Sequence, residues 1–126
     1  MTRSYEDYLA DILYAIEKAQ EFVEGVDADD FYGNTEKIFA VIRALEIIGE
    51  AARHIPSDIQ RQHPDIPWAE IIGMRNVVIH DYFGVDNEVI WRTVQEDLPP
   101  LQLQLADFLQ TISIHDPSAP GRGPTV

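Results

Sequence analysis

The sequence contains no cysteine at all, and it is poor in basic residues. Without cysteine the chain cannot form disulfides or thiolate metal sites, which fits a protein of the cytoplasm. Its apolar residues never form a run near the ~18 residues that cross a bilayer, so we expect no membrane association. No N-terminal stretch joins a basic segment to an apolar one, and we therefore expect no signal peptide.

The shortage of positive charge also limits what the chain can bind. Only 9 Lys and Arg residues stand against 22 Asp and Glu residues, which gives a net charge of −13. Affinity for a polyanion depends on clustered Lys and Arg. The composition thus argues against broad, non-specific binding of nucleic acid, and any RNA substrate must be met in a small, local cleft.

What the sequence does contain is helical periodicity. At 126 residues it has the size of one domain with its own core. Apolar residues recur at three- and four-residue steps, while strand-like alternation never extends beyond a few residues. We predict an all-α antiparallel bundle of four to five helices, with helices over about 4–24, 35–55, 57–61, 67–81 and 87–112.

Several residues predict where these helices begin and end. Ser4, Asn34 and Asp86 are suitable N-caps, and Pro99-Pro100 predicts a kink or a break in the last helix. We read the acidic run 27–30 as a solvated loop. The domain is expected over 1–112, followed by a Pro- and Gly-rich disordered tail over 113–126.

The second long helix carries a glycine and a small polar group. Gly49 inside a helix costs about 1 kcal/mol relative to Ala, so we expect a close helix crossing there. Glu46, Glu50 and His54 follow one another at one-turn intervals. A di-iron bundle site needs two Glu-x-x-His motifs, which this sequence lacks. We therefore interpret Glu50 and His54 as a local polar contact and predict no metal and no cofactor.

The stretch from Gly73 to Gly84 concentrates the chemically capable residues. Arg75 can clamp phosphate oxygens, His80 can move a proton near neutral pH, and Asn76 lies one helical turn before His80. Arg75 and His80, five residues apart, point about 140° apart on one helix. Such a site would be completed by another surface, for example a second copy of the same helix.

A structural explanation of the same residues is also open. An Arg and a His on an amphipathic helix are often surface groups, and a His near a helix C-terminus suits the macrodipole without any function. Tyr82 and Phe83 can be core aromatics. Spacing alone does not decide between these interpretations.

The order of residues around this stretch resembles the HepT family of the HEPN superfamily. The family signature is an Arg, four residues, a His, one residue and a Tyr, which corresponds here to Arg75, His80 and Tyr82. The polar residue after the Arg is Asn76. Further matching positions are Ile66-Pro67-Trp68, Ile71-Ile72-Gly73-Met74, Ile47-Ile48-Gly49-Glu50-Ala51 and Trp91, and the resemblance covers roughly 4–112.

The resemblance implies a homodimeric HEPN bundle that cleaves RNA without a metal. His80 would act as general base or acid, Arg75 would stabilise the charged transition state, and Asn76 would position the phosphate or His80. It also implies a type VII toxin–antitoxin pair, in which a minimal nucleotidyltransferase (MNT) antitoxin transfers AMP from ATP to Tyr82.

Two other functions stay open. Related HEPN chains resemble non-catalytic partners of nucleotidyltransferases that only bind substrate or nucleotide, and in such a chain His80 would be dispensable. A purely structural dimeric bundle is the third possibility. The complete set of Arg75, His80 and Tyr82 favours the toxin over both.

Overall fold

The computed structural model describes residues 3–80 and 86–115, with only the backbone for 76–80 and 113–115. Helices make up almost all of this part, and it contains no strand. The elements are α1 (Tyr5–Phe22), α2 (Ala28–Tyr32), α3 (Thr35–Arg53), α4 (Ser57–Gln62), α5 (Trp68–His80), α6 (Asn87–Arg92), a π-helical turn (Thr93–Asp97) and α7 (Leu98–His115).

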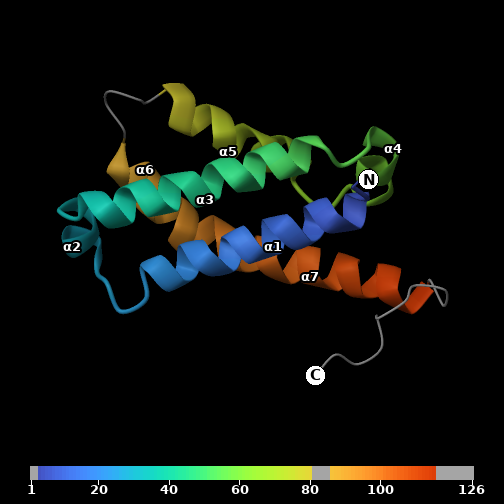
Figure 1. The fold of residues 1–126 in the computed structure, drawn as a ribbon, viewed down its shortest axis with the longest axis horizontal. Coiled ribbons are helices and arrows are strands. Elements are labelled where there is room, and N and C mark those ends of the chain that lie inside the picture. Colours follow the sequence, from blue (N-terminus) through green and yellow to red (C-terminus); the bar gives the residue numbers. More distant parts are fainter. Residues whose placement is uncertain (1–2, 81–85, 116–126) are drawn as a thin grey trace.

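The four longer helices form an antiparallel bundle in which α3 is central. Helix α3 packs against α1 on one side and α5 on the other, while α7 runs along α1 (Figure 1). The short helices α2 and α4 lie at opposite ends of the bundle. The predicted all-α antiparallel bundle is thereby confirmed.

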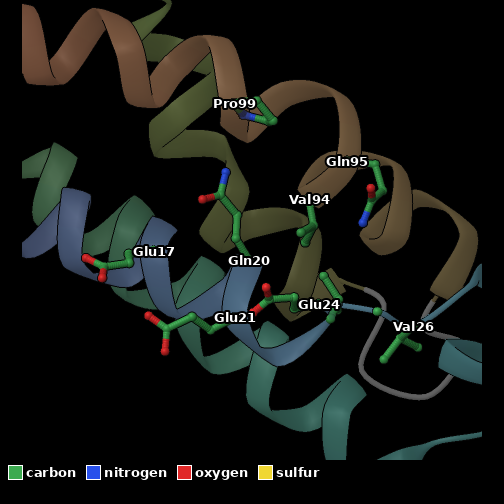
Figure 2. Close-up of a pocket in the computed structure, with 10 residues that line it drawn as sticks. Glu17, Gln20, Glu21, Glu24, Val26, Val94, Gln95 and Pro99 are labelled. Atoms are coloured by element: carbon green, nitrogen blue, oxygen red, sulfur yellow. The ribbon is translucent and has the colours of Figure 1, made fainter.

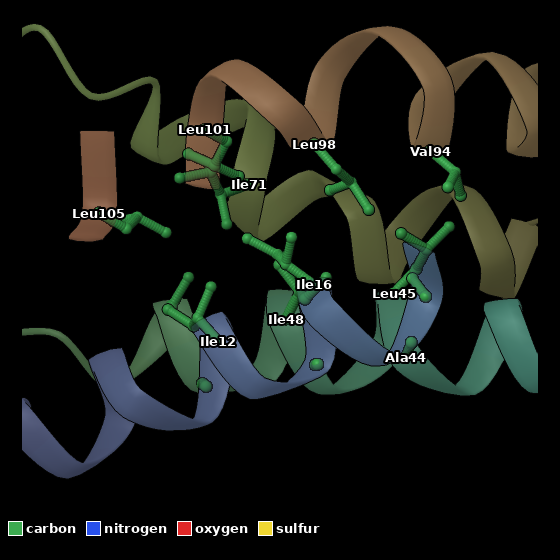
Figure 3. Packing of buried hydrophobic residues seen from close by; sticks show 14 of the residues in the cluster. Ile12, Ile16, Ala44, Leu45, Ile48, Ile71, Val94, Leu98, Leu101 and Leu105 are labelled. Atoms are coloured by element: carbon green, nitrogen blue, oxygen red, sulfur yellow. The ribbon is translucent and has the colours of Figure 1, made fainter. Parts of the chain in front are cut away.

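Apolar stripes from these helices meet in one core. Ile12 and Ile16 of α1 and Ile48 of α3 face Leu101 and Leu105 of α7 (Figure 3). All five are at most 3% exposed. Burying a Leu or Ile side chain contributes about 1.5–3 kcal/mol, so this shared core stabilises the bundle without any cross-link.

The predicted N-caps are confirmed. Ser4 and Asp7 form a reciprocal capping box at the start of α1, with the Ser4 amide 3.0 Å from the Asp7 carboxylate. The Asn34 side chain accepts from the Lys37 amide at 3.0 Å at the start of α3. Asp86 does the same at α6, where it accepts from the amides of residues 88 and 89. Each cap satisfies backbone donors that the first turn leaves unpaired.

The acidic run 27–30 is not the loop that we expected. Asp27 is the N-cap of the short helix α2 and accepts from the Asp30 amide at 2.9 Å. Carboxylates are favourable at the positive end of a helix, and Phe31, fully buried, anchors the turn to the core. The acidic side chains are exposed to solvent as expected, but the backbone is helical because Asp27 caps the turn and Phe31 is buried.

The two prolines interrupt the last helical segment, as the sequence predicts. Neither Pro99 nor Pro100 has an amide hydrogen, so the normal bonds to carbonyls four residues earlier cannot form. A π-helical turn fills the space before them, in which the Leu98 amide bonds to the Thr93 carbonyl five residues back. Helix α7 then continues through His115, so residues 113–115 are helical and do not belong to the tail that we expected over 113–126. The rest of that tail, 116–126, lies outside the described residues.

None of the described helices combines the length and the apolar content that a bilayer crossing requires.

Candidate functional site

Helix α5 presents the predicted motif, and its first turn fixes its position in the bundle. The indole nitrogen of Trp68 donates to the His63 carbonyl at 3.0 Å, and Ile71 is fully buried. The helix begins at Trp68, one residue after the predicted start at Pro67, and its backbone continues to His80. Residues from Trp68 to His80 therefore share one rigid element.

The structure describes the predicted site residues to different extents. Arg75 is half-exposed, with 43% of its side chain accessible. The backbones of Asn76 and His80 lie on the same helix one turn apart, but their side chains are outside the described part. Tyr82 lies outside the described residues altogether. The arrangement of Arg75, His80 and Tyr82 around one phosphate thus stays a prediction.

Arg75 is joined to α3 by an ion pair with Glu50. Its Nε lies 3.4 Å from Glu50 Oε2. The other carboxylate oxygen, Oε1, lies 2.9 Å from a terminal nitrogen of Arg53 and 3.4 Å from His54 Nε2. One carboxylate on α3 therefore connects two groups of its own helix with the motif arginine of α5.

These neighbouring groups lower the pKa of the Glu50 carboxyl group. The hydrogen bond from Arg53 lowers the pKa of Glu50, and the charges of Arg53 and Arg75 and the contact with His54 act in the same direction. A lowered pKa means that the ion pairs of Glu50 with Arg53 and Arg75 are present above the normal value of 4.5 and are lost as pH falls through the lowered pKa. Glu50 is consequently ionised at neutral pH.

The α3–α5 crossing at this point is unusually close because residue 49 has no side chain. A Cβ on Gly49 would lie 2.8 Å from both the Cβ and the backbone nitrogen of Arg75, and 3.1 Å from the Ile72 carbonyl. Real Cβ atoms essentially never show contacts of 2.8 Å, so an approach this close requires glycine at position 49. The predicted close crossing is confirmed, and its partner is the motif arginine itself.

A shallow hollow between α1 and α3 reaches the same carboxylate. It has a volume of about 220 Å³, and both Glu50 and His54 line it. The His54 ring stacks on Tyr8 of α1 with centroids 4.8 Å apart, and the Arg3 guanidinium lies 4.8 Å from the centre of the Tyr8 ring. The hollow thus holds both arginines and carboxylates, and Glu50 links it to Arg75 of α5.

A larger hollow elsewhere does not suit a phosphate. It has a volume of about 630 Å³ and lies between the C-terminal part of α1 and the π-helical turn (Figure 2). Glu17, Glu21 and Glu24 line it together with Gln20 and Gln95, and no Lys or Arg is among its described lining residues. Carboxylates repel a polyanion, so the α3–α5 crossing is the better candidate.

Sequence reasoning assigned Glu50 only to a contact with His54. That contact exists, but the pairing with Arg75 across two helices was missed, because residues 25 apart in sequence show no spacing rule. The available signal was its neighbour Gly49, which indicated a close helix crossing. Among the side chains that the structure describes, those of residues 3–75 and 86–112, no group of three or more His, Asp or Glu is arranged to hold a metal ion.

Comparisons with known proteins agree with the resemblance. The family described as "Ribonuclease HepT-like" matches residues 12–108. The "Probable ribonuclease HepT" of Thermococcus cleftensis is 54% identical over 102 residues, which cover 81% of this chain and 93% of that protein. The "Putative RNase MJ1380" of Methanocaldococcus jannaschii is 42% identical over 103 residues, which cover 82% of this chain and 94% of that protein.

A third relative comes from a bacterium. The "Putative RNase TTE0752" of Caldanaerobacter subterraneus is 41% identical over 103 residues, covering 82% of this chain and 92% of that protein. No solved structure matches the chain. The match of the family over most of the bundle, together with relatives aligned along nearly their whole length, shows that the chain belongs to the HepT-like ribonuclease family.

Proposed function

We propose that the protein is an endoribonuclease that needs no metal, and that it acts as the toxin of a HepT/MNT toxin–antitoxin pair. The observation that supports this proposal most directly is Arg75, a half-exposed arginine at the first position of the family motif. The relatives of this chain in the family are named as ribonucleases. A guanidinium in that setting can bind a phosphate through two parallel hydrogen bonds.

The reaction is a transfer within the RNA chain. The 2′-hydroxyl attacks the adjacent phosphorus while a base removes its proton, and the 5′-oxygen of the next nucleotide leaves with a proton. The products carry a 2′,3′-cyclic phosphate and a 5′-hydroxyl. His80 serves as base or acid, Arg75 stabilises the added charge on the phosphate in the transition state, and Asn76 positions the phosphate or His80.

RNA cleavage by purified variants tests this function. Loss of a general acid–base group typically slows a reaction by about 10²–10⁴-fold, so His80→Ala should nearly abolish cleavage. Arg75→Ala should act similarly, and Arg75→Lys should recover only part of the rate because lysine lacks the planar fork. EDTA should have no effect on the wild-type rate.

A matched control removes one arginine charge from a surface position outside the motif. Arg61 lies on the surface of α4, so Arg61→Ala should cleave RNA at the wild-type rate. Cleavage that survives both His80→Ala and Arg75→Ala, or that EDTA stops, would show that the chemistry lies elsewhere. A folded wild-type protein that cleaves no RNA would favour the non-catalytic partner of a nucleotidyltransferase.

A further inference from the structure

We propose that Glu50 is a positioning residue for Arg75, holding the guanidinium by its Nε so that its two terminal nitrogens remain available to an RNA phosphate. The inference rests on the proposed function, because it requires Arg75 to act on a substrate phosphate. It adds Glu50 of α3, which lies outside the motif, to the residues of α5 that are proposed to act on the substrate.

The division of contacts between the two carboxylate oxygens supports this role. Oε1 is held from its own helix by Arg53 at 2.9 Å and by His54 at 3.4 Å. Oε2 lies 3.4 Å from Arg75 Nε. With one oxygen restrained on α3, the orientation of the carboxylate is fixed and the second oxygen is presented to α5. A carboxylate held in this way restricts the rotamers of the arginine it contacts.

The contact uses the part of Arg75 that phosphate binding does not need. A guanidinium can offer its two terminal nitrogens to two oxygens of one phosphate. In the described part of the chain, the ion pair of Arg75 involves Nε and Glu50 alone. Pairing and phosphate binding are therefore compatible, and the carboxylate restrains the long side chain before the substrate arrives.

The charge balance at the crossing allows a carboxylate near a phosphate site. Arg53 and Arg75 together outweigh the single negative charge of Glu50, and protonation of His54 would add further positive charge. The three paired side chains Arg53, Arg75 and Glu50 therefore carry a net positive charge on a protein whose net charge is −13. Glu50 can orient Arg75 without turning the site negative.

A simpler explanation is an ordinary surface salt bridge. Glu50 is 42% exposed, and exposed ion pairs contribute little to folding because water and salt screen them. The two explanations differ in what changes when the charge is removed. A positioning role predicts a loss of catalytic rate with stability retained, whereas a plain surface pair predicts that both the rate and the stability stay unchanged.

Steady-state cleavage of RNA by Glu50→Gln provides the test, with Glu46→Gln as the matched control. Glu46 lies one turn earlier on α3 and lines the same hollow, yet no ion pair joins it to a described residue. A misplaced catalytic group can cost about 10–100-fold in rate. We expect a loss of this size in kcat for Glu50→Gln, with a smaller change in KM, a normal urea-unfolding midpoint and a wild-type rate for Glu46→Gln.

The Nε–Hε NMR signal of Arg75, assigned from its absence in Arg75→Lys, gives a readout that does not depend on activity. Exchange of this proton with water should be faster in Glu50→Gln than in the wild type and unchanged in Glu46→Gln. Equal exchange in all three proteins would overturn the ion pair in solution.

The results separate the two proposals. A wild-type protein that cleaves no RNA overturns the proposed function and the role of Glu50 with it. Active wild-type protein together with full kcat in Glu50→Gln overturns only the role of Glu50. Parallel losses of rate and stability in Glu50→Gln would reduce Glu50 to a structural residue.

Discussion

Two neighbouring residues of α3 determine the surroundings of Arg75. Gly49 lets the backbone of α5 approach so closely that a Cβ at this position would lie 2.8 Å from Arg75. Glu50 then reaches the guanidinium with its carboxylate. The environment of the motif arginine is therefore built by a dipeptide that lies outside the motif.

At Tyr82 we expect a switch that turns the site off. The phenol oxygen would attack the α-phosphate of ATP held by an MNT partner, lose its proton and release pyrophosphate. The added AMP occupies space that RNA needs, and its negative phosphate can pair with Arg75 in place of the substrate. Intact-mass measurement after incubation with the partner and ATP should show an AMP-sized increase in the wild type and none in Tyr82→Phe.

Tyr14→Phe is the control for this experiment. Tyr14 is 62% exposed on α1, so it is accessible to a modifying enzyme but lies outside the motif, and its loss should leave the mass increase intact. The Tyr82→Phe protein should remain an active nuclease that the partner fails to neutralise. If Tyr82→Phe gains as much mass as the wild type, another residue is the acceptor.

At the scale of helices, the packing of α3 against α5 depends on one of two glycines. Gly49 faces the backbone and Cβ of Arg75, neither of which can move aside as a flexible side chain can. At Gly73, in the middle of α5, no described atom beyond its own stretch of helix lies within 4 Å of the position that a Cβ would take. The same substitution should therefore have opposite effects at the two positions.

Gly49→Ala should destabilise the protein, while Gly73→Ala should not. Overpacking typically costs about 1–3 kcal/mol, which exceeds or equals the ~1 kcal/mol that alanine gains over glycine in a helix. At Gly73 no overpacking opposes the substitution, so only the helix-forming advantage of alanine over glycine applies. Urea unfolding of both variants measures the difference, and equal stability of the two would mean that the helices are not in such close contact.

At the scale of the whole molecule, we expect a homodimer with the α5 helices near the two-fold axis. The 140° offset between positions 75 and 80 on one helix leaves the site incomplete in a single copy, and a second copy could supply the missing group. Each chain carries a net charge of −13, so two copies repel each other at long range. Association should tighten as salt rises toward about 0.15 M, where the Debye length is ~8 Å.

Light scattering at low and moderate salt concentrations measures the mass of the particle in solution and so tests for the homodimer. The measured mass should be twice the chain mass of 14.3 kDa, and the fraction of dimer should be larger at the higher salt concentration. A mass equal to one chain at every protein and salt concentration would contradict a site shared between two copies.

The sequence predicts the long helices and their caps, because these depend on interactions between residues three or four positions apart, and the order of the motif is read from it directly. It also indicated a close crossing at Gly49 and an interruption at Pro99-Pro100, since glycine and proline restrict the backbone directly. The helical state of residues 28–32 was decided by tertiary structure, through the burial of Phe31. So was the pairing of Glu50 with Arg75, because an ion pair between two helices depends on how those helices pack, which no local spacing records.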